Sequence, residues 1–306
     1  MKRKKKTDKS LLCFYISLII LPVIQFVIFY IIVNANSLVL SFKNYYYDDG
    51  GNLVSEFVGL KNVFNIYKLM FTDAQYLVML KNSLLYYLIS IVLGAGISLF
   101  FSYYIFKKRL FAGFFKTVLY LPQIVSTMVI TIMYKYFCEY GLPNIVETLT
   151  GIKTGGFSAS LNSEFVYMII LLVYLSCGSN MLIYTSTMGS ISDSVIEAAE
   201  VDGVNSFQEF WYIVLPSIFP TFSLFMVTGM LYIFIGQGCL FNLYGLEAPN
   251  EFHNYGYYLY VQVKNYVGDY THYPHLASFG LALTFIALPL IFGLKWLLQK
   301  FGPKAD

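Results

Sequence analysis

Residues 194–216 read SVIEAAEVDGVNSFQEFWYIVLP, and they connect two stretches of the chain that carry no charged residue. The first of these stretches is Phe165–Ser192 and the second is Phe210–Leu246. Charged residues make up 12% of the 306 residues and hydrophobic residues 58%, whereas soluble domains carry about 25% charged residues. This composition excludes an ordinary soluble enzyme, a disordered protein and a nucleic-acid binder.

Charge-free stretches also occur in the rest of the chain, at Leu11–Val33, Leu84–Phe106, Thr117–Tyr134 and Leu276–Leu294. A helix needs about 20 apolar residues to cross a bilayer. The six stretches therefore predict an all-α, polytopic membrane protein with six transmembrane helices. Pro216 and Pro220 predict a single fifth span from about Ser217 to Cys239, because proline is favoured in the first turn of a helix.

The first charge-free stretch has two interpretations. A basic head precedes it, and Val33-Asn34-Ala35 resembles the small-residue cleavage site of a secretory signal peptide. Its 23 residues exceed the apolar region of about 7–15 residues that is typical of such peptides. The length favours an uncleaved transmembrane helix.

Basic residues predict the orientation of the spans. Of the 20 Lys and Arg residues, 13 lie in residues 1–10, 107–116 and 295–306. Cytoplasmic loops of membrane proteins carry an excess of Lys and Arg, so we expect both termini in the cytoplasm. The predicted organisation is a basic cytoplasmic N-terminus (1–10), a first span (11–33), an extracytoplasmic segment (34–83), a core of five spans (84–299) that contains the loop 189–216, and a cytoplasmic tail (300–306). Within the extracytoplasmic segment, apolar residues recur at helical spacing in Glu56–Lys81, which predicts a short helix at the membrane face.

The loop between spans four and five is acidic and is predicted to form two helices. Ser194 followed by Glu197 is typical of a capping box that opens a helix, and Gly203 can adopt the left-handed turn that ends it. Ala198 and Ala199 are small enough to allow close approach of another surface. Helices that lie on anionic membranes are usually basic. The acidic loop therefore favours a protein partner over lipid headgroups.

The same loop matches a known pattern: Glu-Ala-Ala, three residues, Gly, nine residues, Ile, one residue, Leu-Pro. All of its positions are present here, at Glu197, Ala198, Ala199, Gly203, Ile213, Leu215 and Pro216. The chain resembles the permease subunits of binding-protein-dependent ABC importers in the bacterial inner membrane, with a type I importer fold. The resemblance implies that the loop, with Asp202, is a coupling helix that docks on a separate ATPase.

Further motifs resemble the carbohydrate branch of this family, the maltose-type and glycerol-3-phosphate-type permeases. They are Phe57–Asn62, Asn82-Ser83, Leu121-Pro122, Gly141–Asn144, Tyr257–Val261 and Ala277-Ser278. The region Asn242–Pro249 lacks the Thr-x-Gly-Gly-Pro element that is usual in sugar permeases. The resemblance nevertheless favours transport of a sugar or oligosaccharide.

The resemblance also implies partners: a second, related permease subunit that makes a heterodimer, two copies of a cytoplasmic ABC ATPase, an extracellular solute-binding protein and membrane lipid, but no nucleic acid. No phosphate-binding Gly-x-x-x-x-Gly-Lys-Ser/Thr motif occurs, so ATP and Mg²⁺ are expected on the partner ATPase and no cofactor on this chain. His272 and His275 are separated by Pro274. We predict neither a metal site nor an enzyme.

Polar residues inside spans four and five are candidates for a substrate path. Such residues usually face a cavity or a neighbouring helix. They are Ser176, Ser179, Asn180, Thr228, Tyr232 and Gln237. Packing between small residues explains any one of them equally well. Spans four to six carry no Arg or Lys to bind an anion, which favours a neutral solute. Transport of another small solute such as glycerol-3-phosphate, a membrane-bound enzyme and a non-transporting receptor or scaffold remain alternatives.

Overall fold

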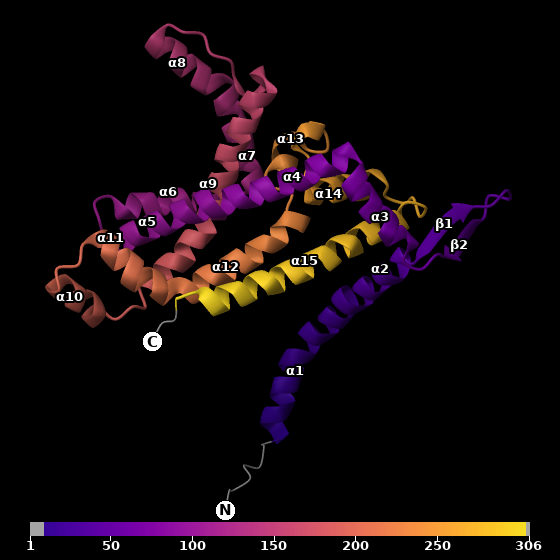
Figure 1. The fold of residues 1–306 in the computed structure, drawn as a ribbon, viewed down its shortest axis with the longest axis horizontal. Coiled ribbons are helices and arrows are strands. Elements are labelled where there is room, and N and C mark those ends of the chain that lie inside the picture. Colours follow the sequence, from indigo (N-terminus) through magenta and orange to yellow (C-terminus); the bar gives the residue numbers. More distant parts are fainter. Residues whose placement is uncertain (1–8, 304–306) are drawn as a thin grey trace, which may run out of the picture. The chain divides into compact units, whose positions relative to one another are not determined.

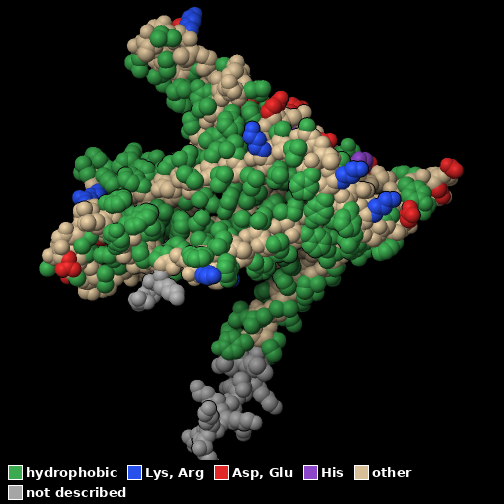
Figure 2. All heavy atoms as spheres, viewed as in Figure 1, with side chains coloured by type: hydrophobic (Ala, Val, Ile, Leu, Met, Phe, Trp, Pro, Cys, Tyr) green, Lys and Arg blue, Asp and Glu red, His purple; other side chains and the backbone are tan. Residues whose placement is uncertain are grey.

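The computed structural model describes residues 9–303, which are mostly helical (Figure 1). They belong to two compact units, one comprising Met1–Leu69 and Tyr266–Thr284 and the other Met70–Asn265 and Phe285–Asp306. On the face drawn in Figure 2, hydrophobic side chains predominate and charged side chains are few. This surface is typical of a protein that contacts lipid.

The first unit begins with one continuous helix. It consists of α1 (Lys9–Phe26), a π-helical turn (Val27–Ile32) and α2 (Val33–Ser41). The helix runs eight residues beyond the predicted end of the first span at Val33, and Asn34 and Ala35 lie inside α2. In its most apolar window none of the residues is buried by the rest of the protein, as expected of a helix that faces lipid.

A β-hairpin follows, where the sequence predicted an extracytoplasmic segment with a helix over Glu56–Lys81. Strands β1 (Lys43–Tyr47) and β2 (Leu53–Phe57) pair antiparallel, with Lys43 opposite Phe57. The helix α3 covers only Lys61–Thr72, and a new helix starts after Asp73. The helix is shorter than predicted at both ends, because Glu56 and Phe57 pair with Asn44 and Lys43 in the hairpin and Asp73 caps a new helix.

The second unit is built around long helices. The first is a continuous helix of α4 (Ala74–Ile89), a π-helical turn (Ser90–Ala95) and α5 (Gly96–Phe106); the second is α9 (Leu161–Met188). The third joins α11 (Ser206–Glu209), a π-helical turn (Phe210–Val214) and α12 (Leu215–Ile235). It starts well before the predicted Ser217, because the chain is already helical from Ser206 and continues through the π-helical turn into α12, which contains Pro216 and Pro220.

The predicted third span, Thr117–Tyr134, is broken rather than straight. Helix α6 (Ala112–Ile124) ends at Val125, which has extended backbone, and α7 (Thr127–Tyr136) begins at an angle of 110°. Pro122 lacks the N–H that would bond to the carbonyl of Val118, and the Tyr174 hydroxyl donates to that carbonyl instead at 3.2 Å. The break therefore follows a proline-weakened turn.

Shorter helices and a final long helix complete the structure. They are a π-helical turn (Phe137–Gly141), α8 (Leu142–Thr150), α13 (Leu240–Tyr244), α14 (Tyr255–Asn265), α15 (Tyr273–Phe301) and the 3₁₀ turns Phe157–Ala159 and Asn250–Phe252. Among the described residues, five helices are long and apolar enough to cross a membrane, and the bent α6–α7 pair makes a sixth if it is one span. The predicted class, a helical multi-pass membrane protein, is confirmed.

Helix α9 packs closely against two neighbours through small residues. Towards α5, the Ser98 hydroxyl donates to the carbonyl of Cys177 at 3.2 Å and the Ser102 hydroxyl to that of Met181 at 2.9 Å. Towards α6, a Cβ added to Gly178 would lie 2.7 Å from the carbonyl oxygen of Leu119. These contacts fix α9 between α5 and α6, and α9 leads directly to the acidic loop.

Candidate functional site

The acidic loop folds as two short helices, as predicted, but with different caps. Helix α10 (Asp193–Val201) begins after Ser192, whose backbone is extended, so Ser194 and Glu197 do not form the predicted capping box. A capping box opens α11 instead, where Asn205 and Gln208 exchange hydrogen bonds of 2.9 and 3.1 Å between side chain and backbone. The loop does contain a capping box, but it opens α11 and not α10.

Gly203 makes the turn between the two helices. Its φ is +75°, and the next amide, at Val204, donates to the carbonyl of Ala199 at 3.1 Å. This left-handed conformation, expected from the sequence, is costly for residues that have a Cβ. Gly203 therefore sets the direction in which α11 leaves α10.

The loop exposes only part of its sequence motif. Glu197, Ala198 and Asp202 are exposed, whereas Ala199 is only 5% exposed because its own chain covers it. The expectation that both alanines offer a contact surface is wrong for Ala199. Ile213, Leu215 and Pro216 are half-buried in the π-helical turn and the start of α12.

The second half of the motif packs on α9. Val214 and Ile218, on either side of the Leu-Pro pair, are fully buried in one cluster with Tyr184 and Met188 of α9. The two long helices that the loop connects are therefore packed together at the ends from which it emerges.

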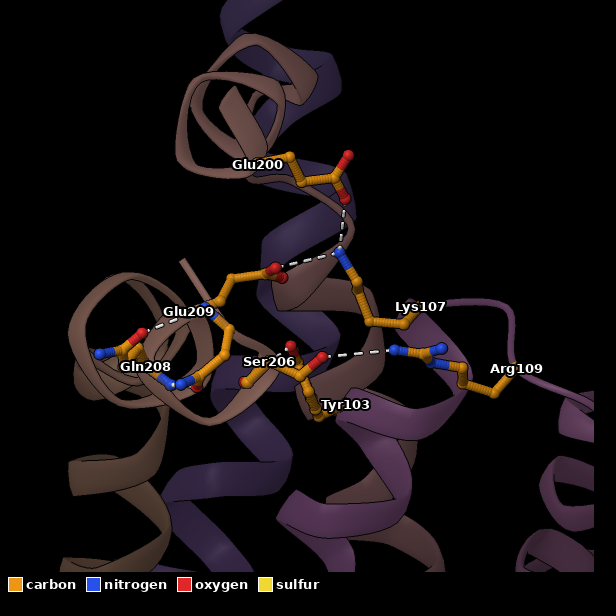
Figure 3. Close-up of polar contacts among 8 residues, drawn as sticks. Tyr103, Lys107, Arg109, Glu200, Ser206, Gln208 and Glu209 are labelled. Carbon is orange, nitrogen blue, oxygen red and sulfur yellow. Dashed lines mark hydrogen bonds and ion pairs between the residues drawn. The ribbon is translucent and has the colours of Figure 1, made fainter. Parts of the chain in front are cut away.

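A lysine from another loop makes ion pairs with two of the acidic residues (Figure 3). The Nζ atom of Lys107, just after α5, lies 3.1 Å from Glu200 Oε1 and 3.0 Å from Glu209 Oε2. Burial opposes the charge of Lys107, but hydrogen bonds to Glu209 and Glu200 outweigh it and raise the pKa of the ammonium group. Sequence reasoning missed this contact, because the partners are 93 and 102 residues apart.

Two further residues, Tyr103 in the last turn of α5 and Arg109 in the loop after it, hold the same loop. The Tyr103 hydroxyl donates to the backbone carbonyl of Ser206 at 3.0 Å, and Arg109 donates to the Ser206 hydroxyl at 3.3 Å (Figure 3). The first turn of α11 is thus attached to α5 by an ion pair and two hydrogen bonds.

A cavity of about 710 Å³ lies among α4, α9 and α12. Five of the residues predicted for a substrate path line it: Ser176, Asn180, Thr228, Tyr232 and Gln237. The side chain of the sixth, Ser179, is outside the described part of the structure. The Ser176 and Thr228 hydroxyls donate to backbone carbonyls of their own helices at 2.7 and 2.9 Å. Ser176 also lies against Gly94, so the packing interpretation applies to it as well.

The cavity wall is polar but uncharged. The polar lining residues that sequence reasoning missed are Ser83, Tyr86, Tyr87, Ser90, Thr127, Tyr184, Asn242 and Asn254. Among the described residues that line the cavity, none is Asp, Glu, Lys or Arg. Such a wall offers hydroxyls, amides and aromatic rings to a ligand, and no fixed charge.

Part of the wall comes from the segment between α12 and α14, which is fixed to α4. The Asn82 amide donates to the carbonyls of Glu251 and His253 at 2.7 and 2.9 Å, and the Tyr86 hydroxyl donates to that of Phe252 at 2.9 Å. Ser83 accepts from the amide of Tyr255 at 3.1 Å. The Asn82-Ser83 pair therefore has a physical role: it satisfies buried backbone groups beside the cavity.

Comparison with known families decides the class of the protein. A family described as "Binding-protein-dependent transport system inner membrane component" matches residues 90–306, which include the acidic loop and much of the cavity wall. The chain belongs to this family. The permease is therefore a multi-pass membrane component of a transport system, as its sequence motif indicated.

Curated relatives support this membership. The permease is 30% identical over 278 residues to the probable ABC transporter permease protein YesP of Bacillus subtilis, covering 84% of this chain and 86% of the relative. It is 25% identical to the multiple sugar-binding transport system permease protein MsmF of Streptococcus mutans, covering 92% and 93%. A match to the osmoprotective compounds uptake permease protein GgtC of Synechocystis is 29% identical and spans only 64% of that relative's length.

Solved structures share the fold. A chain of a bacterial ABC transporter that imports the acidic polysaccharide alginate superposes with a TM-score of 0.74 at 18% identity, covering 94% of this chain and 96% of the other. A second alginate transporter structure, in complex with an alginate pentasaccharide-bound periplasmic protein, also gives 0.74, at 17% identity and 96% coverage of both chains. At this identity the likeness concerns the fold alone.

Proposed function

We propose that the permease is one of two related membrane subunits of an ATP-driven importer for a neutral sugar or oligosaccharide. An extracellular solute-binding protein delivers the sugar, and two copies of a separate ATPase supply the energy. The uncharged cavity carries the proposal: its hydroxyl and amide groups can replace the hydrogen bonds that a sugar makes with water, and its tyrosine rings can stack on the sugar.

Glycerol-3-phosphate is the second candidate, because permeases named for its transport in Yersinia are 27% identical over 187 residues. A phosphate inside a membrane protein requires Arg or Lys partners. The described cavity wall offers none. The neutral sugar is therefore the better candidate.

The substrate proposal is tested by uptake into proteoliposomes that contain the full importer and its binding protein. The test solutes are radiolabelled maltose and raffinose as neutral sugars, an alginate oligosaccharide as an acidic one, and glycerol-3-phosphate. We expect ATP-dependent uptake of a neutral sugar. Uptake restricted to the charged solutes would contradict the proposal.

In the proposed mechanism, ATP binding moves the docked helix α10, and α9 and α12 follow. The buried contacts of Val214 and Ile218 with Tyr184 and Met188 join these helices near the loop. Movement of such a joined unit changes which side of the membrane the cavity opens to. Glu197 is exposed on α10 and is the proposed partner of a basic residue on the ATPase.

Two substitutions in the loop test the coupling. We expect Glu197→Lys to leave folding unchanged within about 0.5 kcal/mol, as for most exposed sites, and to abolish both uptake and substrate-stimulated ATP hydrolysis. Gly203→Pro should also abolish uptake and substrate-stimulated ATP hydrolysis by distorting the turn between α10 and α11, because proline requires a φ of about −65° and Gly203 has +75°. The exposed Ser194→Ala serves as the matched control. Undiminished uptake by a folded Glu197→Lys variant would exclude the docking role.

A further inference from the structure

The ammonium group of Lys107 joins three elements of the second unit. It contacts Glu200 on the docking helix α10 and Glu209 on α11, and it immediately follows α5. We call this set of three residues the Lys107 bridge. The side chains of Lys107 and Glu209 are 15% and 3% exposed, respectively. Water therefore screens this pair far less than it screens an ion pair at the surface.

The bridge compensates a buried charge. The second carboxylate oxygen of Glu209, Oε1, is buried and has no hydrogen-bond partner among the described residues. The contact from Lys107 to Oε2, at 3.0 Å, is thus the main compensation for removing the carboxylate from water. Separating Glu209 from Lys107 would leave a buried carboxylate without a cation, which is strongly destabilising. The fold therefore favours keeping this ion pair.

The bridge also has a direct structural route to the cavity. Lys107 directly follows the continuous helix Ala74–Phe106, and this helix places Tyr86, Tyr87 and Ser90 in the cavity wall. Other attachments of the loop to the cavity run through α9 and α12, and the hydrogen bond from Tyr103 to Ser206 joins α5 to α11. The Lys107 bridge is the ion-paired link from the end of α5 to both helices of the loop.

We propose that Lys107 is a positioning residue for transport: it makes α5 move together with the α10–α11 loop, so that ATP-driven motion reaches the α4 side of the cavity. This inference rests on the proposed function of the loop as the ATPase contact. It predicts a specific defect when the bridge is lost: ATP is still hydrolysed, but less solute crosses for each ATP.

The test compares four variants of the complete importer in proteoliposomes. Lys107→Met removes the bridge, and Lys107→Arg keeps a cation in the same place. The double variant Lys107→Met/Glu209→Gln removes the cation and also the buried charge that would be left unpaired. The exposed neighbour Lys108→Met is the matched control. Uptake, ATP hydrolysis, thermal unfolding and co-purification of the ATPase are measured for each.

We expect the solute carried per ATP to fall by about tenfold in Lys107→Met, a common size for coupling between sites, and to stay near wild type in Lys107→Arg and Lys108→Met. The double variant separates stability from coupling. It should recover thermal stability and ATPase assembly, but its transport ratio should remain low.

Two results would overturn the inference. One is a folded double variant with the wild-type transport ratio, because the bridge would then only stabilise the fold. The other is a folded double variant that no longer binds the ATPase, because Lys107 would then shape the docking surface. Failure of the sugar proposal is distinguishable, since it would already be visible as absent sugar uptake by the wild-type importer.

Discussion

His253 is a buried histidine in the segment that closes one side of the cavity. Its Nε2 atom lies 3.0 Å from the carbonyl oxygen of Ala248, and its Nδ1 atom is buried without a partner among the described residues. Nε2 therefore carries the proton in the neutral ring. Burial lowers the pKa of His253 below its usual value of 6.5, although the Ala248 carbonyl and Glu251 favour the charged form.

This environment predicts that the segment is less stable in acid. Above pH 6.5 both the closed and the opened segment keep His253 neutral, so its stability is unaffected. As the pH falls below that value, the opened segment binds a proton that the closed segment rejects, and stability is lost. Hydrogen exchange of residues 245–254 should therefore indicate easier opening at about pH 5.5 than at about pH 7.5, after correction for the intrinsic exchange rate.

The control for this prediction is His253→Gln, which can keep a donor near Ala248 and does not titrate. The pH dependence of opening should disappear in that variant. An equal pH dependence in both proteins would assign the effect to other groups.

At the scale of elements, α9 depends on small residues where it meets its neighbours. A side chain at Gly178 would collide with the backbone of Leu119 and with the Gln123 side chain, which are 2.7 and 3.2 Å from the position of an added Cβ. Gly178→Val should thus separate α9 from α6 and cost roughly 1–3 kcal/mol, as overpacking usually does. A lower midpoint of thermal unfolding would confirm it.

Gly96 on α5 is the matched control for Gly178. Nothing lies within 4 Å of the position that its Cβ would occupy, so Gly96→Ala should be neutral or slightly stabilising. If Gly178→Val and Gly96→Ala unfolded at the same temperature, close contact between α9 and α6 would not be needed for stability.

The helices and strands also show which parts of the fold could be predicted from the sequence. Charge-free stretches located the long helices, but helix ends were missed where a helix continues through charged residues, as at Lys81 in α4 and Glu209 in α11. The hairpin and the break at Ser126 were missed too. The second strand overlaps the start of a segment whose apolar spacing predicted a helix. The break follows Pro122, which leaves the Val118 carbonyl to be bonded by Tyr174 of another helix.

The same reasoning applies to the candidate site. The spacing of Ser176 and Asn180 put them on one face of α9, and both line the cavity. Tyr86, Asn242 and Asn254 come from other elements, so no local pattern could group them with α9. The Lys107 bridge is a similar case, because a lone lysine after a span resembles any other basic loop residue.

At the scale of the whole molecule, charged residues and the cavity lie in different parts of the chain. Basic residues gather in segments predicted to be cytoplasmic, whereas the described cavity wall has no charge at all. The acidic loop between α9 and α12 is the exception to this basic bias, and Lys107 offsets part of its negative charge through ion pairs with Glu200 and Glu209. The carboxylates of Asp193, Glu197 and Asp202 remain exposed for a partner.

The predicted orientation can be tested with single cysteines and a membrane-impermeant maleimide. The four cysteines include one exposed residue, Cys13, which is replaced by Ser; the other three are buried. New cysteines replace the exposed residues Asp49, Lys108 and Lys153. If the N-terminus is cytoplasmic, Asp49→Cys should react in intact spheroplasts, and Lys108→Cys should react only after permeabilisation, because the helix Ala74–Phe106 lies between them.

Lys153→Cys decides whether the bent α6–α7 pair crosses the membrane. A 110° bend is compatible with a broken span and with a loop that enters and leaves on one side. If the pair crosses, Lys153 lies opposite Lys108 and its cysteine reacts from outside, like that at Asp49. Six crossings then place both termini in the cytoplasm, as the basic residues predict. If Lys153→Cys reacted only after permeabilisation, the pair would be re-entrant, and five crossings would place the α9–α12 loop on the side opposite Lys108. That result would contradict both ATPase docking on the loop and the contacts of Lys107 with Glu200 and Glu209 at 3.1 and 3.0 Å.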